Sequence, residues 1–67
     1  MIFNSIRALI KPLTIWRLKH GQIVMIASEP YRIFEPDGSE FVDVINQSNN
    51  STEQIYLDSF YEATKIG

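Results

Sequence analysis

The side chains that could carry out chemistry are few in this sequence. The single histidine, His20, precedes Gly21 in a segment typical of a turn, and no acidic residue lies at a local spacing that would orient it. Nucleophilic catalysis needs a Ser, Thr or Cys activated by a neighbouring base. Acid–base catalysis needs a carboxyl group buried enough to raise its pKa. Asp43, between Val42 and Val44, is expected to point to solvent by strand alternation, so the sequence predicts no catalytic site.

Metal and cofactor sites lack their usual motifs as well. The chain has no cysteine, which excludes disulfides and thiolate zinc sites. The segment 37–40 is too short for a calcium-binding loop, and the three glycines are too far apart for a phosphate-binding loop. We therefore expect a protein that is not an enzyme and carries neither metal nor cofactor. The missing cysteines favour a reducing compartment, the cytoplasm, or the host cytoplasm if the protein is viral.

Binding is the remaining kind of function, and the aromatic residues are its main candidates. Hydrophobic residues make up 45% and aromatic residues 12% of the chain, as in a globular domain. Aromatic side chains commonly anchor protein interfaces, and acids beside them would attract a basic partner. The residues predicted to contact a partner protein are Trp16, Tyr56, Phe60, Tyr61, Asp58 and Glu62.

The charges are distributed unevenly along the chain. Five of the six cations precede Ile33, whereas seven of the eight acids follow it, and the formal net charge is -2. Folding could bring the two halves together and balance their charges, or it could leave a dipolar surface with an acidic side. Both interpretations remain open from the sequence.

Weak binding of single-stranded nucleic acid is the alternative function. Small barrels often combine cations with stacking aromatic residues for this purpose. The candidates are Arg17, Lys19, Tyr31 and Arg32, which could share one edge of a sheet if neighbouring strands pair. Because six cations give few phosphate contacts, the affinity would be low and strongly dependent on salt.

The length of 67 residues allows one domain, expected over 1–67. Ile2, Phe3, Ile6, Leu9 and Ile10 follow a helical spacing, which predicts an amphipathic helix over 1–11 that ends before Pro12. No segment is apolar enough to span a membrane. The remainder, 13–66, is expected to be rich in strands.

β-branched and aromatic residues predict four strands, at 14–19, 22–28, 31–35 and 40–45. Turn residues separate them at His20–Gly21, Glu29–Pro30 and 36–39. Val42 and Val44 are expected on one face of the fourth strand, and Phe41, Asp43 and Ile45 on the other. A polar loop over 46–52 follows.

The C-terminal segment has two interpretations. As a strand, it would point Ile55 and Leu57 inward and Tyr56 outward, make a single turn at Asp58–Phe60, and end in a short strand over 61–66. As a helix, it would begin at Ser51 and complete a capping box with Gln54. The strand interpretation is favoured. The helical one would give an α+β fold, a small antiparallel sheet with N- and C-terminal helices.

The segments 18–26, 31–33 and 55–60 resemble SH3-like small barrels of the KOW and Tudor type. In those families a turn that contains glycine opens a strand with alternating core residues, and the chain ends as strand, single 3-10 turn, strand. The resemblance implies a mainly β fold, a partly open five-stranded barrel, here with a short N-terminal helix. It also implies a ligand bound through loops and exposed aromatic residues.

Together these features predict a small protein-binding module without enzymatic activity. A separate domain that starts at Met1 suggests a viral or accessory product that inhibits or modulates a host protein. A third expectation is a homo-oligomer that associates through the apolar face of the N-terminal helix.

Overall fold

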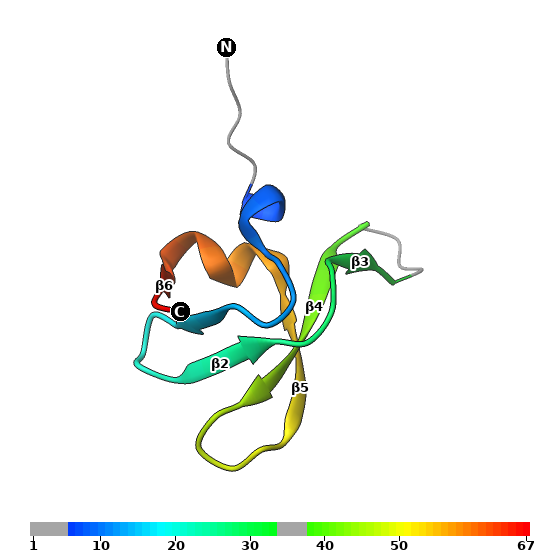
Figure 1. Cartoon of the computed structure of the whole chain (residues 1–67). Coiled ribbons are helices and arrows are strands. Elements are labelled where there is room, and N and C mark those ends of the chain that lie inside the picture. Colours follow the sequence, from blue (N-terminus) through cyan, green and yellow to red (C-terminus); the bar gives the residue numbers. More distant parts are fainter. Residues whose placement is uncertain (1–5, 34–37) are drawn as a thin grey trace.

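The computed structural model describes residues 6–33 and 38–67. Its strands are β1 (Ile15–Arg17), β2 (Ile23–Ile26), β3 (Tyr31–Arg32), β4 (Glu40–Asn46), β5 (Thr52–Tyr56) and β6 (Thr64–Lys65). Two 3-10 helices, η1 (Ile6–Leu9) and η2 (Leu57–Glu62), contact each other. Figure 1 shows the strands in one curled antiparallel sheet. The predicted mainly β fold is therefore confirmed, but the half-barrel has six strands within the described residues, where five were expected.

Strand β4 is the centre of the sheet. It pairs with β5 on one side and with both β2 and β3 on the other, while β1 lies between β2 and β6. Between β2 and β3 the Ala27 N–H still donates to the Asp43 carbonyl at 2.8 Å, and the Asp43 N–H donates to Ser28 Oγ at 3.1 Å. The chain therefore bends at Glu29–Pro30 but does not reverse there, and β2 and β3 pair with successive parts of β4.

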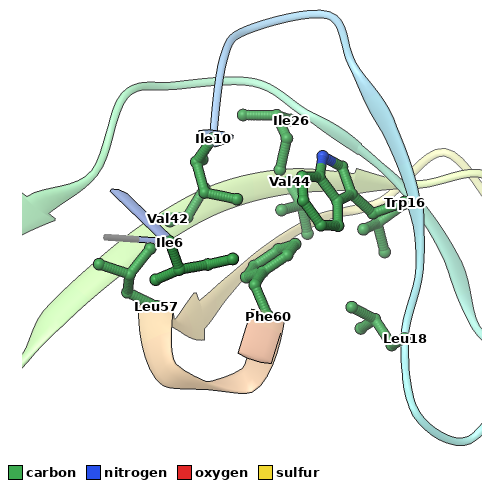
Figure 2. Close-up of a cluster of buried hydrophobic side chains, with 10 residues drawn as sticks. Ile6, Ile10, Trp16, Leu18, Ile26, Val42, Val44, Leu57 and Phe60 are labelled. Carbon is green, nitrogen blue, oxygen red and sulfur yellow. The ribbon is translucent and has the colours of Figure 1, made fainter. Parts of the chain in front are cut away.

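The core lies on the concave side of the sheet. Alternation along the strands places Val24, Ile26, Val42 and Val44 on this side, all fully buried. Phe60 comes from η2 and stands among the strand residues, as Figure 2 shows. Its ring meets that of Trp16 edge to face, with centroids 5.4 Å apart. One aromatic pair therefore joins η2 to the first hairpin of the sheet.

The buried indole of Trp16 is satisfied by a local chain of hydrogen bonds. Its Nε1 donates to Thr14 Oγ1 at 3.0 Å, and that hydroxyl donates to the Lys11 carbonyl at 2.7 Å. The Thr14 N–H also donates to the Lys11 carbonyl, which closes a turn containing Leu13 at a positive φ of 74°. This turn carries the chain from η1 into β1.

The N-terminal segment differs from the prediction. Only Ile6–Leu9 is helical and it is a 3-10 turn, so the predicted helix over 1–11 is wrong within the described residues. Ile6 and Ile10 are buried in the core, but Leu9 is 52% exposed. The helical turn ends at Leu9, so Ile10 reaches the core from the residue that follows the turn and not from the face of a longer helix. Ile2 and Phe3 lie outside the described residues.

The C-terminal segment follows the strand interpretation. Ile55 packs against the core, Leu57 is buried, and Tyr56 points outward, as predicted. The turn is longer than expected, because η2 takes up all of Leu57–Glu62 and leaves only Thr64–Lys65 for the last strand. The α+β alternative with a C-terminal helix is therefore wrong. The polar loop before β5 bends at Asn50, which has a φ of 62°.

Candidate protein-binding face

Three aromatic rings form a row across the convex side of the sheet. The register places Tyr31 of β3 opposite Phe41 of β4, and Phe41 opposite Tyr56 of β5. The ring centroids are 6.5 Å apart for the first pair and 4.7 Å for the second. Phe41 is buried without belonging to the core cluster, because its neighbours on this side cover it. We call these three residues the aromatic row.

A polar row lies beside it on the same face. Asp43 and Gln54 are cross-strand partners, one step further along β4 and β5. Tyr31 Oη donates to Asp43 Oδ1 at 2.6 Å and accepts from Gln54 Nε2 at 2.8 Å. The bond to Asp43 raises the pKa of Tyr31, since only the neutral phenol can donate it. Asp43 thus fixes the end of the row instead of pointing freely to solvent.

The other end of the aromatic row opens into a polar hollow. Its volume is about 270 Å³, and its lining residues are Gly38, Ser39, Glu40, Tyr56, Leu57 and Asp58. We call it the Tyr56 hollow. Tyr56 is 53% exposed, and Asp58 is also exposed. Two residues that the sequence analysis proposed for partner binding, Tyr56 and Asp58, therefore meet at one place.

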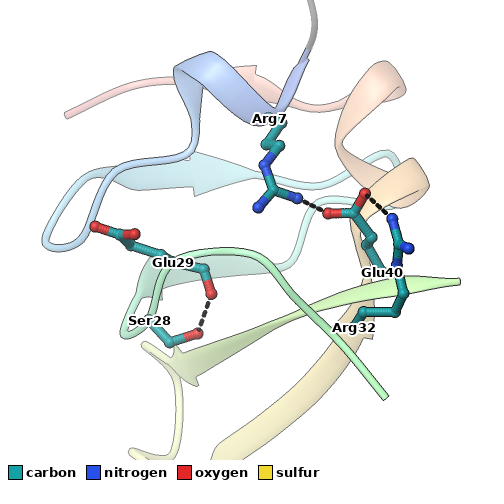
Figure 3. A network of polar contacts seen from close by, with 5 residues as sticks. All are labelled: Arg7, Ser28, Glu29, Arg32 and Glu40. Carbon is teal, nitrogen blue, oxygen red and sulfur yellow. Dashed lines mark hydrogen bonds and ion pairs between the residues drawn. The ribbon is translucent and has the colours of Figure 1, made fainter. Parts of the chain in front are cut away.

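Ion pairs join the cationic first half of the chain to the acidic second half. Figure 3 shows the Glu40 carboxylate between two guanidinium groups, with Oε1 bound to Arg7 and Oε2 3.5 Å from Arg32 Nη2. Lys19 Nζ lies 3.0 Å from Glu62 Oε1. Three ion pairs within the described residues thus cross between the halves, which favours charge balance over a strongly dipolar surface.

Two of the predicted partner-binding residues are not on the surface. Trp16 is 3% exposed and Phe60 is fully buried, so neither can contact a partner while the protein is folded. Their prediction as anchors is wrong, because the two rings pack against each other inside the core. Tyr61 is 64% exposed, and Glu62 of the same helix is exposed and paired with Lys19.

The residues of the nucleic-acid alternative do not share an edge. Arg17 and Lys19 belong to β1 and the turn after it, whereas Tyr31 and Arg32 form β3, and two strands separate β1 from β3. Lys19 and Arg32 are engaged with acids, and Tyr31 is part of the aromatic row. The predicted shared edge is therefore wrong, because β3 pairs with β4 and not with its neighbours in sequence from the first hairpin.

His20 lies in the turn between β1 and β2 and is exposed. It borders a second hollow of about 250 Å³ whose apolar lining comes from Leu18 and Ile55.

Within residues 6–33 and 38–67, no three His, Asp or Glu side chains lie close enough together to form a metal site. Neither 3-10 helix described here is long and apolar enough to cross a membrane.

Glu53 of β5 belongs to a cluster of polar side chains. The Glu53 carboxylate accepts from Asn46 Nδ2 and from Gln22 Nε2, both at 3.1 Å. The hydrogen bonds from Asn46 and Gln22, in that order of effect, lower the pKa of Glu53 below its ordinary value of 4.5. The charged form is therefore favoured in the folded protein.

This lowered pKa makes stability depend on pH. A carboxyl group with a folded-state pKa below its unfolded value adds stability above the unfolded pKa, and that stability is lost as the pH falls through the folded pKa. For Glu53→Gln we expect a smaller loss of unfolding free energy between about pH 6 and about pH 3 than in the wild type. Urea titrations at both pH values measure it, and equal losses in the two proteins would contradict the assignment.

Sequence reasoning missed Phe41, Asp43 and Gln54 as parts of the face. The alternation along β4 placed Phe41 and Asp43 on the side opposite the core, which was the available signal. Their clustering with Tyr31 depends on the register of three strands, and the amino-acid sequence alone does not give that register.

No protein-family model matches this sequence, and no curated protein or solved structure is significantly similar to it.

Proposed function

We propose that this protein is a non-enzymatic module that binds a partner protein through the aromatic row and the adjoining Tyr56 hollow. The observation that carries the proposal is the row itself, in which three aromatic side chains lie side by side on the side of the sheet away from the core. Phe41 is covered by two partly exposed rings, and it lies outside the core that stabilises this small domain. Aromatic residues in such positions are typical anchors of protein interfaces.

The order of the strands supports an SH3-like class of small barrel for the module. β5 leads through the 3-10 helix η2 into β6, and β6 returns to pair with β1. The chain thus ends as strand, 3-10 turn, strand, the arrangement that the resemblance implied. In this proposal, the convex face and its adjoining loops serve as the contact surface.

The charges favour a protein over a nucleic acid as the partner. Arg7, Arg32 and Lys19 are engaged with acids of the same chain, and the net charge is -2. A protein gains affinity for a nucleic acid when its Lys and Arg side chains neutralise phosphates and so release the counterions of the backbone. Few Lys and Arg side chains of this chain are available for that role. A module of this type would act by occupying its partner's surface, as expected of an accessory inhibitor or modulator in the cytoplasm.

Selection of random peptides displayed on phage against the immobilised protein tests the proposal. We expect the wild type to enrich a family of related peptides, and Tyr56→Ala to weaken their binding about tenfold or more, as at an aromatic anchor. Tyr61→Ala is the matched control, since Tyr61 is an exposed tyrosine outside the aromatic row.

Circular dichroism of both variants would show that the fold is kept. If no peptide family is enriched, or if Tyr56→Ala binds the selected peptides as well as the wild type does, the proposed face is wrong. A larger loss for Tyr61→Ala than for Tyr56→Ala would move the interface to η2.

A further inference from the structure

We infer that the Tyr56 hollow receives an arginine side chain of the partner, with the guanidinium group against the Tyr56 ring and hydrogen-bonded to the Asp58 carboxylate. This inference rests on the proposed function, because it names the chemistry by which the module would recognise a partner. It is carried by a juxtaposition in the structure: a half-exposed ring and an exposed carboxylate line the same hollow.

The Tyr56 ring is held in place for such a contact. Its centroid lies 4.7 Å from that of Phe41, with 32° between the ring planes, so the ring packs against a buried neighbour. Tyr56 is nevertheless 53% exposed, which leaves much of its surface open to solvent. A planar guanidinium group stacks well on an aromatic face, and a ring that is already fixed loses little conformational entropy when it is contacted.

The acids of the hollow differ in their engagement. Both oxygens of Glu40 are taken by guanidinium groups, those of Arg7 and Arg32, and neither arginine lines the hollow. Asp58 has no hydrogen bond or ion pair within the described residues. It is therefore the carboxylate that a partner's cation can reach. The Glu40 carboxylate is already neutralised by two guanidinium groups. The partner's guanidinium group would therefore be held by Tyr56 and Asp58.

The size of the hollow fits one side chain better than a whole ligand. Pockets for drug-sized molecules usually measure about 300–1,000 Å³, and this one is about 270 Å³ and open to solvent. Its lining is mostly polar, which disfavours an aliphatic occupant. Arginine suits it better than lysine, because the guanidinium group combines a flat face for Tyr56 with paired donors for a carboxylate.

The test uses three small probes and the ¹⁵N-labelled full chain. N-acetyl-arginine amide should cause saturable shifts of the amide signals of Ser39, Tyr56 and Asp58. N-acetyl-citrulline amide has the same shape without the charge, and we expect it to bind about fivefold to tenfold more weakly. N-acetyl-glutamate amide should cause no shifts at these positions.

Variants then assign the contacts. Asp58→Asn should weaken the arginine probe to the level of citrulline, whereas Glu62→Gln, which removes an acid of the same helix outside the hollow, should not. Arg32→Gln should tighten binding, since it removes a nearby positive charge. Equal binding of arginine and citrulline, unchanged binding by Asp58→Asn, or preferential binding of glutamate would overturn the inference.

The outcomes separate this inference from the proposed function. Enriched peptides that need Tyr56 but lack arginine would leave the protein-binding face standing and overturn the arginine site. If no peptides are enriched while the arginine probe binds with dependence on Asp58, the hollow is confirmed and the protein-binding function is wrong.

Discussion

Replacing Phe60 with alanine is expected to remove a large part of the free energy of unfolding. Phe60 is fully buried, and its ring is the contact by which η2 reaches Trp16. Truncation of a buried phenylalanine costs about 3–5 kcal/mol, and a domain of this length has a total stability of about 3–10 kcal/mol. The variant should therefore unfold at a much lower urea concentration than the wild type, with a free energy of unfolding about 3–5 kcal/mol smaller.

The matched control for Phe60→Ala is Tyr61→Ala. The two positions are adjacent in η2, but Tyr61 is 64% exposed. Its truncation should change the unfolding free energy by less than about 0.5 kcal/mol, as expected of a surface position. If Phe60→Ala kept a dispersed spectrum and lost no more stability than Tyr61→Ala, the core described above would be wrong.

Placing an acid at Ile10 is expected to unfold the protein. Ile10 is 2% exposed and packs in the core with Ile6 and Phe60. An aspartate there would bury a carboxyl group without a partner or would expel the N-terminal segment, and either outcome costs several kcal/mol. Thermal unfolding followed by circular dichroism should show no cooperative transition for Ile10→Asp.

Leu9→Asp is the matched control for Ile10→Asp. Leu9 precedes Ile10 and is 52% exposed, so the acid at position 9 should leave the fold and the melting temperature nearly unchanged. The pair also tests the expected homo-oligomer. If the apolar N-terminal residues formed an interface between copies, Leu9→Asp would lower the molecular mass in solution; if they formed only a core, Ile10→Asp would unfold a monomer. Light scattering distinguishes the two.

The strands could be predicted from the sequence because their signals are local. Alternation in β4 separated Val42 and Val44 from Phe41 and Asp43, and the structure places the two sets on opposite sides of the sheet. The inward and outward positions of Ile55 and Tyr56 follow from the same two-residue period. Each of these assignments requires only the neighbours of a residue in the chain.

The N-terminal segment could not be predicted in this way. The spacing of its apolar residues matched an α-helix, but Ile6 reaches the core from a 3-10 turn and Ile10 from the residue after that turn. An isolated helix of this length is marginally stable, so tertiary packing decides its geometry. The same holds for Trp16 and Phe60. Their residue types are common at interfaces, but in the folded protein the two rings pack against each other in the core.

The candidate site depends on contacts between distant parts of the chain. Tyr31, Phe41 and Tyr56 come from three strands, and their row exists because β4 pairs with both β3 and β5. The sequence identified Tyr56 and Asp58 from their types alone, without indicating that they line one hollow. It assigned Tyr31 to a nucleic-acid edge, since nothing local specifies that β3 pairs far from β1.

The most direct test of the protein-binding face is to map a selected peptide onto the protein by amide chemical shifts. The aromatic row predicts that the largest changes occur at Tyr31, Phe41, Gln54 and Tyr56, across three strands of the convex side. Changes confined to the turn at 18–22 and to Ser59 and Glu62 would place the partner at the second hollow and contradict the proposed face.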